Sequence, residues 1–280
     1  MIKSNYPNEM SVHMIYLRQA ILADERPAYW PYTIPALKNL EQLVFTAPVT
    51  LLSGDNGTGK STLLEALAVK LSLPAVGRMD AGRDETLAGL RPFARGMRLV
   101  FEKRPALKFF LRSEDFFNFT VGLQKQREEM RVELQRVEKE YADRSMFAQN
   151  QARAAYAGSI GDMEQRYGQD LLEAASHGES FLRLFQERLA PNGLYLLDEP
   201  EAPLSPLRQL TLYSILKELS HEGNCQFIIA THSPILLAME GAVVYDMDQN
   251  PPTQTNWEDL PGVKLMKGFL NNPKAYTSRL

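Results

Sequence analysis

Residues 54–62 of the chain are Gly54-Asp55-Asn56-Gly57-Thr58-Gly59-Lys60-Ser61-Thr62. They fit the pattern G-x-x-x-x-G-K-[ST], a glycine-rich loop whose backbone surrounds the phosphates of a nucleotide. The apolar run at 48–52 predicts a buried strand before the loop, and leucines at helical spacing predict a helix after it, ended by Pro74. A chance glycine turn would not have this context, so we expect the chain to bind a nucleoside triphosphate.

Each part of the loop has an expected role. Glycines let the backbone turn tightly and approach a ligand, and the amides at the following helix N-terminus face an anion. Lys60 would reach the β- and γ-phosphates, and the hydroxyl of Ser61 would bind Mg²⁺. The nucleotide-binding residues predicted in the loop are Asn56, Gly57, Thr58, Gly59, Lys60, Ser61 and Thr62.

Composition limits the class of protein only broadly. The 280 residues could form one large domain or two small ones, and a hydrophobic content of 44% is enough for a sizeable core. A net charge of −3, from 31 basic and 34 acidic residues, does not indicate nucleic-acid binding, although a local patch could still provide it. Cys225 is the single cysteine, which excludes an internal disulfide and suits a reducing compartment.

The first residues are polar and lack the apolar run of a signal peptide, and no stretch of the sequence is apolar for long enough to span a membrane. We therefore expect a cytoplasmic protein without membrane insertion.

Apolar patterns before residue 50 predict β structure. Segment 91–112 interleaves cations with apolar residues, as two paired strands would. These cations could contact nucleic-acid phosphates, or they could be the solvated face of a strand. They are Arg91, Arg95, Arg98, Lys103, Arg104, Lys108 and Arg112.

The middle of the chain predicts one long amphipathic helix from 121 to about 156, broken by Gly158-Ser159-Ile160-Gly161. A second helix is expected over 181–189 and a third over 207–219. Four-residue apolar runs at 194–197 and 227–230 predict strands that are buried on both faces.

Polar residues that could take part in catalysis follow both of these strands. Asp198 and Glu199 end the first, where an acid can hold the Mg²⁺ shell beside Ser61. We assign Asp198 to the metal and Glu199 to the general base that activates or orients water; the alternative is a pair of helix-capping acids. His232 follows the second strand and could bind the γ-phosphate or the attacking water, although a lone histidine is often structural.

Segment 175–180, Ala175-Ser176-His177-Gly178-Glu179-Ser180, precedes an apolar helix. Its Ser-x-Gly-Glu arrangement is an ordinary N-terminal cap, and a helix N-terminus with a glycine is also able to bind an anion. The two functions are compatible.

These motifs together resemble the ATPases of the ABC superfamily, which carry a phosphate loop, a signature, an acidic strand end and a histidine switch in this order. Asp198-Glu199-Pro200 and Thr231-His232-Ser233 match motif residues one by one, and Ser176 and Gly178 align with the signature serine and second glycine. His177 and Glu179 depart from the usual glycine and glutamine. The Ser-His-Gly-Glu-Ser form resembles small stand-alone ATPases related to the chromosome-maintenance and DNA-repair branch.

The resemblance implies an α/β phosphate-loop NTPase fold with a mixed, mainly parallel core sheet, an N-terminal antiparallel β subdomain and a helical insert. It implies a single ATPase domain over 1–280, with the helical lobe at about 115–178. The ligands would be ATP and Mg²⁺.

It also implies a homodimer in which two heads enclose two ATP molecules. Ser176, Gly178 and Glu179 of one subunit would complete the ATP site of the other. The catalytic residues in that site would be Lys60, Glu199 and His232.

Two family features have no clear counterpart. Arg112, Ser113 or Glu114 stands where the family often carries a glutamine that senses Mg²⁺. Trp30 or Tyr32 could stack on adenine, or both could pack in the core.

Three functions remain open from the sequence. The first is an ATPase that dimerises on ATP and acts on DNA, or on a DNA-processing or effector protein, in genome maintenance or defence. The second is the ATPase subunit of a membrane transporter. The third is a slow nucleotide-gated module that controls an effector.

Overall fold

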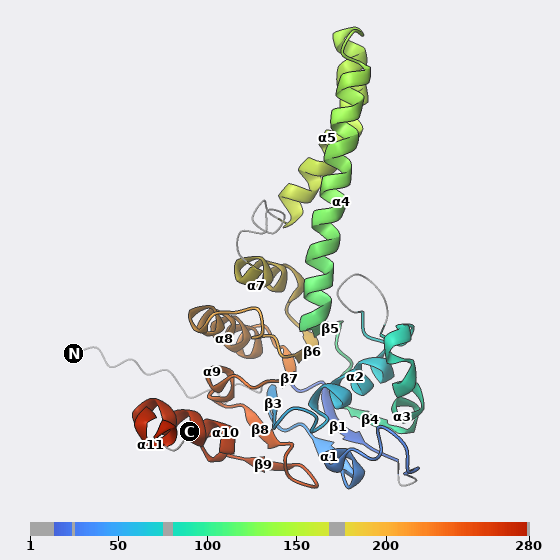
Figure 1. The fold of residues 1–280 in the computed structure, drawn as a ribbon. Coiled ribbons are helices and arrows are strands. Elements are labelled where there is room, and N and C mark those ends of the chain that lie inside the picture. Colours follow the sequence, from blue (N-terminus) through green and yellow to red (C-terminus); the bar gives the residue numbers. More distant parts are fainter. Residues whose placement is uncertain (1–13, 24–25, 75–80, 168–176, 279–280) are drawn as a thin grey trace, which may run out of the picture.

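The computed structural model describes residues 14–23, 26–74, 81–167 and 177–278 (Figure 1). Nine strands in this part of the chain form two sheets. The three-stranded sheet has the order β2-β1-β4, and the six-stranded sheet has the order β5-β6-β7-β3-β8-β9. The strands are β1 (Leu17–Ile21), β2 (Gln42–Val44), β3 (Val49–Ser53), β4 (Arg98–Phe101), β5 (Leu107–Arg112), β6 (Gly193–Asp198), β7 (Gln226–Ala230), β8 (Val243–Asp246) and β9 (Thr253–Thr255).

The fold class predicted from the sequence is confirmed. Strands β5, β6, β7, β3 and β8 are parallel, β9 joins them antiparallel, and β1, β2 and β4 form a separate antiparallel sheet. β3, β6 and β7 are buried along their length except at Asp198, which explains their continuous apolar sequence.

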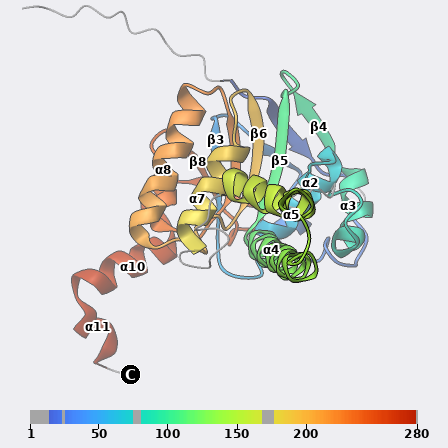
Figure 2. The same cartoon turned by 90° about the horizontal axis from the view of Figure 1, so that it is seen from above.

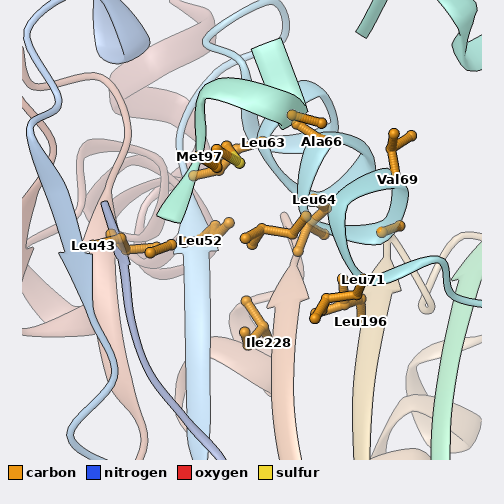
Figure 3. Packing of buried hydrophobic residues seen from close by; sticks show 14 of the residues in the cluster. Leu43, Leu52, Leu63, Leu64, Ala66, Val69, Leu71, Met97, Leu196 and Ile228 are labelled. Carbon is orange, nitrogen blue, oxygen red and sulfur yellow. The ribbon is translucent and has the colours of Figure 1, made fainter. Parts of the chain in front are cut away.

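Helices cover both faces of the six-stranded sheet, and others project from it or pack at its margin (Figure 1). They are α1 (Pro35–Lys38), α2 (Lys60–Leu71), α3 (Arg91–Gly96), α4 (Ser113–Glu140), α5 (Met146–Tyr167), α7 (His177–Arg188), α8 (Pro206–His221), α9 (Pro234–Leu237), α10 (Pro261–Asn271) and α11 (Pro273–Thr277), with 3₁₀ turns η1 (Glu85–Leu90) and η2 (Trp257–Asp259). Because strand side chains alternate between faces, Leu196 and Ile228 pack with α2, whereas Leu197 and Ile229 pack with α7, α8 and α9. Figure 3 shows the first of these clusters, with Leu64 of α2 lying over the sheet. Helices α2 and α7 therefore lie on opposite faces (Figure 2).

The long helix predicted over 121–156 is instead two helices. α4 ends at Glu140, a turn follows, and α5 begins at Met146 and packs along α4. The predicted break at Gly158–Gly161 is wrong, because these residues lie inside α5. A glycine inside a helix costs only about 1 kcal/mol relative to alanine, which packing between two helices can offset. The pair projects away from the sheets (Figure 1).

The paired strands predicted within 91–112 are also corrected. Residues 91–96 are α3, and the two strands that follow belong to different sheets: β4 pairs with β1, and β5 pairs with β6. The alternation of charged and apolar residues identifies two strands, but it does not indicate which strand each of them pairs with.

None of the helices in the described ranges combines the length and the apolarity needed to cross a membrane.

A buried side-chain amide joins the two sheets. The side chain of Gln226, at the start of β7, is fully buried. Its Oε1 accepts hydrogen bonds from the backbone N–H groups of Tyr16 (2.9 Å) and Leu17 (2.8 Å), and its Nε2 donates to the carbonyl of Leu17 (2.9 Å). These groups lie at the start of β1, so the amide satisfies backbone that would otherwise be buried without partners.

We expect Gln226→Leu to lower the free energy of unfolding by about 3 kcal/mol, because buried backbone groups that lose their partners each cost about 1–3 kcal/mol. Urea unfolding followed by circular dichroism measures this change. Gln42→Leu, at an exposed position of β2, is the matched control and should change stability by less than about 0.5 kcal/mol. Equal stability of the two variants would contradict the role given to Gln226.

Candidate nucleotide-binding site

The candidate site lies where four parallel strands end together. β3 leads into the glycine loop, and β6 ends at Asp198. β7 ends at Ala230, two residues before His232, and β8 ends at Asp246. The register pairs Asp198 with Ala230 and Ser53 with Asp246, so these strand ends share one edge of the sheet. Ligands of open α/β sheets bind at this edge.

The glycine loop between β3 and α2 has backbone that only glycine adopts freely. Gly54, Gly57 and Gly59 have φ angles of +154°, +81° and +100°. A Cβ on Gly59 would lie 2.8 Å from Cγ2 of Ile34, whereas a Cβ on Gly57 would meet no atom within 4 Å. The loop is thus packed on the protein at its base and open where a phosphate would approach.

The ammonium group of Lys60 lies inside this loop. Its Nζ donates hydrogen bonds to the carbonyls of Gly54 (2.7 Å) and Asp55 (2.8 Å), and the residue is 4% exposed. Burial lowers the pKa of Lys60, and the carboxylates of Glu199 and Asp248 act in the opposite direction. A cation held among carbonyls in a glycine loop can exchange them for phosphate oxygens at little structural cost.

Ser61 and Asp198 form the pair expected at a Mg²⁺ site. The Ser61 hydroxyl donates to Oδ1 of Asp198 over 3.0 Å. Burial is the main cause that raises the pKa of Asp198 to about 7; the nearby carboxylates of Glu199 and Glu65 act in the same direction, and the Ser61 hydrogen bond acts against them. One hydroxyl and one carboxylate are hard oxygen donors, which Mg²⁺ combines with phosphate oxygens and water. They therefore fit the ion, and across the described ranges no group of three or more His, Cys, Asp or Glu offers a cage made of protein alone.

Glu199 and His232 lie side by side beyond this pair. Glu199 Oε1 is 3.5 Å from His232 Nε2, and both side chains are 40% exposed. Glu199 has a φ of +47°, which is unusual for a residue with a side chain and is a feature of functional sites. Its N–H donates to the carbonyl of Ala230 (2.9 Å), which ties this turn to the end of β7.

The other predicted loop residues also lie in the motif: Asn56 and Thr58 in the glycine loop, and Thr62 in the first turn of α2. The loop residues thus share one edge with Asp198, Glu199 and His232. Ser176 lies outside the described residues. Gly178 and Glu179 belong to the first turn of α7, which packs on the other face of the sheet from α2.

The structure bears on two questions that the sequence left open: which residue takes the place of the Mg²⁺-sensing glutamine, and which aromatic side chain could stack on adenine. Arg112 ends β5 beside Asp198, and its buried guanidinium forms ion pairs with Asp84 (3.1 Å) and Glu65 (3.4 Å). Ser113 begins α4 and is followed by Glu114. Tyr32 is buried edge-on against Phe93, which leaves only Trp30, half-exposed, as a stacking candidate of the two.

Sequence reasoning missed Asp248. Its Oδ1 accepts a hydrogen bond from the backbone N–H of Asp55 (2.9 Å) and so anchors the glycine loop to the segment after β8. The available signal was the apolar run at 242–245 followed by Asp246 and Asp248, a third strand end of the type recognised at Asp198.

The raised pKa of Asp198 makes stability depend on pH. Between the ordinary aspartate pKa and about 7, the folded protein holds one proton more than the unfolded chain, so its stability falls as pH rises and levels off above about 7. Asp198→Asn does not lose this stability as pH rises, because asparagine does not titrate. Its stability relative to wild type should therefore grow by about 2 kcal/mol from about pH 5 to about pH 8.

Urea unfolding of both proteins with EDTA and without nucleotide measures the difference. Asp143→Asn, at an exposed turn position, is the control and should show no such growth. A constant difference between Asp198→Asn and wild type would contradict the desolvation of Asp198.

Family models match two parts of the chain. One described as an AAA domain matches residues 33–147, and one described as "AAA domain, putative AbiEii toxin, Type IV TA system" matches residues 172–238. The thiamine import ATP-binding protein ThiQ of Vibrio cholerae is 27% identical over 66% of this chain and 68% of its own length. ThiQ of Chelativorans is 29% identical over 69% of each.

Among solved structures, a nucleotide-free ATP-binding cassette from an ABC transporter aligns with a TM-score of 0.43 and 16% identity over 95% of this chain and 98% of its own. A dimeric cassette bound to ADP and Pi aligns with a TM-score of 0.40 and 14% identity over 86% and 98%. The glycine loop, the Ser61–Asp198 pair and the two AAA-domain matches make this chain a phosphate-loop ATPase that binds ATP with Mg²⁺.

Proposed function

We propose that two copies of this chain close on two ATP molecules, so that each site is built by one copy and completed by the other. The half-exposed pair of Glu199 and His232 carries this proposal, because both side chains remain accessible to a second molecule. The first turn of α7, with Gly178 and Glu179, packs on the opposite face from α2 and could meet such an open site on a second molecule. Ser176, just before α7, would join it there.

The residues of one copy would divide the work of hydrolysis. The loop amides and Lys60 hold the β- and γ-phosphates, and Ser61 and Asp198 hold Mg²⁺, which neutralises charge on the phosphates. Glu199 orients and deprotonates the attacking water, and His232 binds the γ-phosphate or that water. The 3.5 Å separation of Glu199 and His232 allows one water to contact both.

The partner is proposed to be DNA or a DNA-processing or effector protein. Lys70, Arg104 and Lys108 line a hollow of about 340 Å³ together with apolar residues that include Phe101. No ion pair engages these three cations within the described residues. Such a hollow suits a phosphate backbone.

A transporter subunit is the second candidate, because the curated relatives are named as thiamine import ATP-binding proteins. The projecting pair α4–α5 and the unusual residues His177 and Glu179 favour the first candidate.

Two variants test the shared site. Glu199→Gln should bind ATP, fail to hydrolyse it and accumulate as a dimer in sedimentation. Ser176→Arg should bind ATP as a monomer without turnover. When the two inactive proteins are mixed, half of the dimers carry one intact site, so up to about a quarter of the wild-type rate should return.

Lys60→Ala mixed with Glu199→Gln is the control, because both variants damage the same half of the site and no intact site can form. No recovery with Ser176→Arg, or a monomeric Glu199→Gln in ATP, would overturn the shared site. Wild-type phosphate release no greater than that of Lys60→Ala would favour the slow regulatory module.

Duplex DNA should raise the ATPase rate of wild type at low salt, and Arg104→Ala with Lys108→Ala should reduce this stimulation several-fold and weaken its salt dependence, because fewer DNA phosphates are then neutralised by protein cations. Lys139→Ala with Arg144→Ala, on the far turn of α4–α5, is the control for total charge. No stimulation, together with recovery of a multi-span membrane protein on the tagged chain, would favour the transporter subunit.

A further inference from the structure

A buried carboxylate lies behind the Glu199–His232 pair. Glu201 belongs to the turn after β6 and is 9% exposed. Its Oε1 accepts three hydrogen bonds: from the hydroxyl of Thr231 (2.6 Å), from the backbone N–H of His232 (2.8 Å) and from the backbone N–H of Ser233 (3.1 Å). Three donors on one carboxylate oxygen hold this side chain in a fixed position.

These bonds join two segments that are far apart in the sequence. The three donors belong to the loop that carries His232, and the acceptor belongs to the turn that carries Glu199. The turn is itself closed by hydrogen bonds from the N–H of Ala202 to the carbonyl of Glu199 (3.0 Å) and from the N–H of Leu204 to the carbonyl of Glu201 (2.8 Å). A shift of the Glu201 carboxylate would therefore move His232 relative to Glu199.

A second set of bonds closes a ring around the same segments. The Ser233 hydroxyl donates to Oε1 of Gln209 in α8 (2.6 Å), and Nε2 of Gln209 donates to the carbonyl of Leu204 (3.1 Å). The loop after β7, helix α8 and the turn after β6 are thus fixed to one another through Ser233, Gln209 and Glu201.

Keeping a carboxyl group here is costly. Oε2 of Glu201 is buried and has no hydrogen-bond partner among the described residues, and burial raises the pKa of this carboxyl group. A buried polar atom without a partner calls for an explanation, and strained or desolvated groups of this kind gather at functional sites.

We propose that Glu201 is a positioning residue, whose carboxylate holds the His232 loop against the Glu199 turn at the separation that ATP hydrolysis requires. It acts through Thr231, His232 and Ser233 and does not itself contact the reacting groups. The proposal rests on the function proposed above, because it gives Glu199 and His232 their roles in hydrolysis.

Glu201→Ala should lower kcat by about 10²-fold, the scale expected when catalytic groups move by about 1 Å. KM for ATP should change by less than about 3-fold, because the glycine loop is not touched. Glu201→Gln keeps one acceptor oxygen and should recover part of the rate. Glu222→Gln, at an exposed position after α8, is the matched control and should have the wild-type kcat.

Amide hydrogen exchange supplies a readout that does not need turnover. In Glu201→Ala the amide of His232 loses its acceptor and should exchange at least about 10-fold faster, whereas the amide of Ser233 keeps the Thr231 hydroxyl (3.0 Å) as an acceptor and should be affected less. The glycine loop should exchange as in wild type. Should Glu201→Ala not fold, Thr231→Val removes one of the three donors and should lower kcat about 10-fold at unchanged KM, on the scale of one hydrogen bond to a charged group.

A wild-type kcat in Glu201→Ala, or in Thr231→Val if the former does not fold, would overturn the proposal, as would equal losses in kcat and nucleotide affinity. Unchanged exchange at His232 would overturn the attachment itself. Faster exchange in a protein whose wild type shows no turnover above Lys60→Ala would refute the proposed function and, with it, the catalytic role of Glu201, while leaving the attachment in place.

Discussion

Parallel pairing of β6, β7, β3 and β8 is the constraint on which the site depends. Because these strands run in one direction and in register, the chain leaves the sheet four times at the same edge, and each exit carries residues of the candidate site. The exits supply the glycine loop, Asp198 with Glu199, His232, and Asp248. Helices bury both faces of this sheet, so the strand ends are held in place by the core on either side.

The geometry of the site is maintained at a cost in desolvation. Lys60, Asp198 and Glu201 are all largely removed from water, and burial shifts the pKa of each toward its neutral form. Bound ATP and Mg²⁺ would reverse the pKa shifts of Lys60 and Asp198, because phosphate favours the charged ammonium of Lys60 and a metal cation favours the charged carboxylate of Asp198. The desolvation of Glu201 is offset differently, because the partners of its carboxylate are hydrogen-bond donors within the chain and not a ligand. Binding and positioning thus depend on separate buried charges.

The sequence was most informative where function restricts it. The glycine loop, the strands at 194–197 and 227–230 and the polar residues that follow them were predicted because motif and periodicity agree, and the structure brings the described ones to one edge. The sequence was less informative where the structure of a segment depends on which other segment packs against it. Alternation in 91–112 revealed two strands but not their separate sheets, and Gly158–Gly161 stayed helical because α4 packs beside α5. Glu201 went unnoticed because its donors lie about thirty residues away, and only the tertiary structure joins them.

The junction of β5 and α4 gives the projecting helices a mechanical property. Arg112 pairs in register with Asp198, and α4 begins at the next residue without an intervening loop. The 28 residues of α4 span about 42 Å at 1.5 Å per residue. A tilt of about 10° at that junction would carry the far turn through about 7 Å on that length. The helix is therefore a lever whose base adjoins Asp198, and a small rotation at the end of β5 becomes a displacement of several ångströms at its far turn.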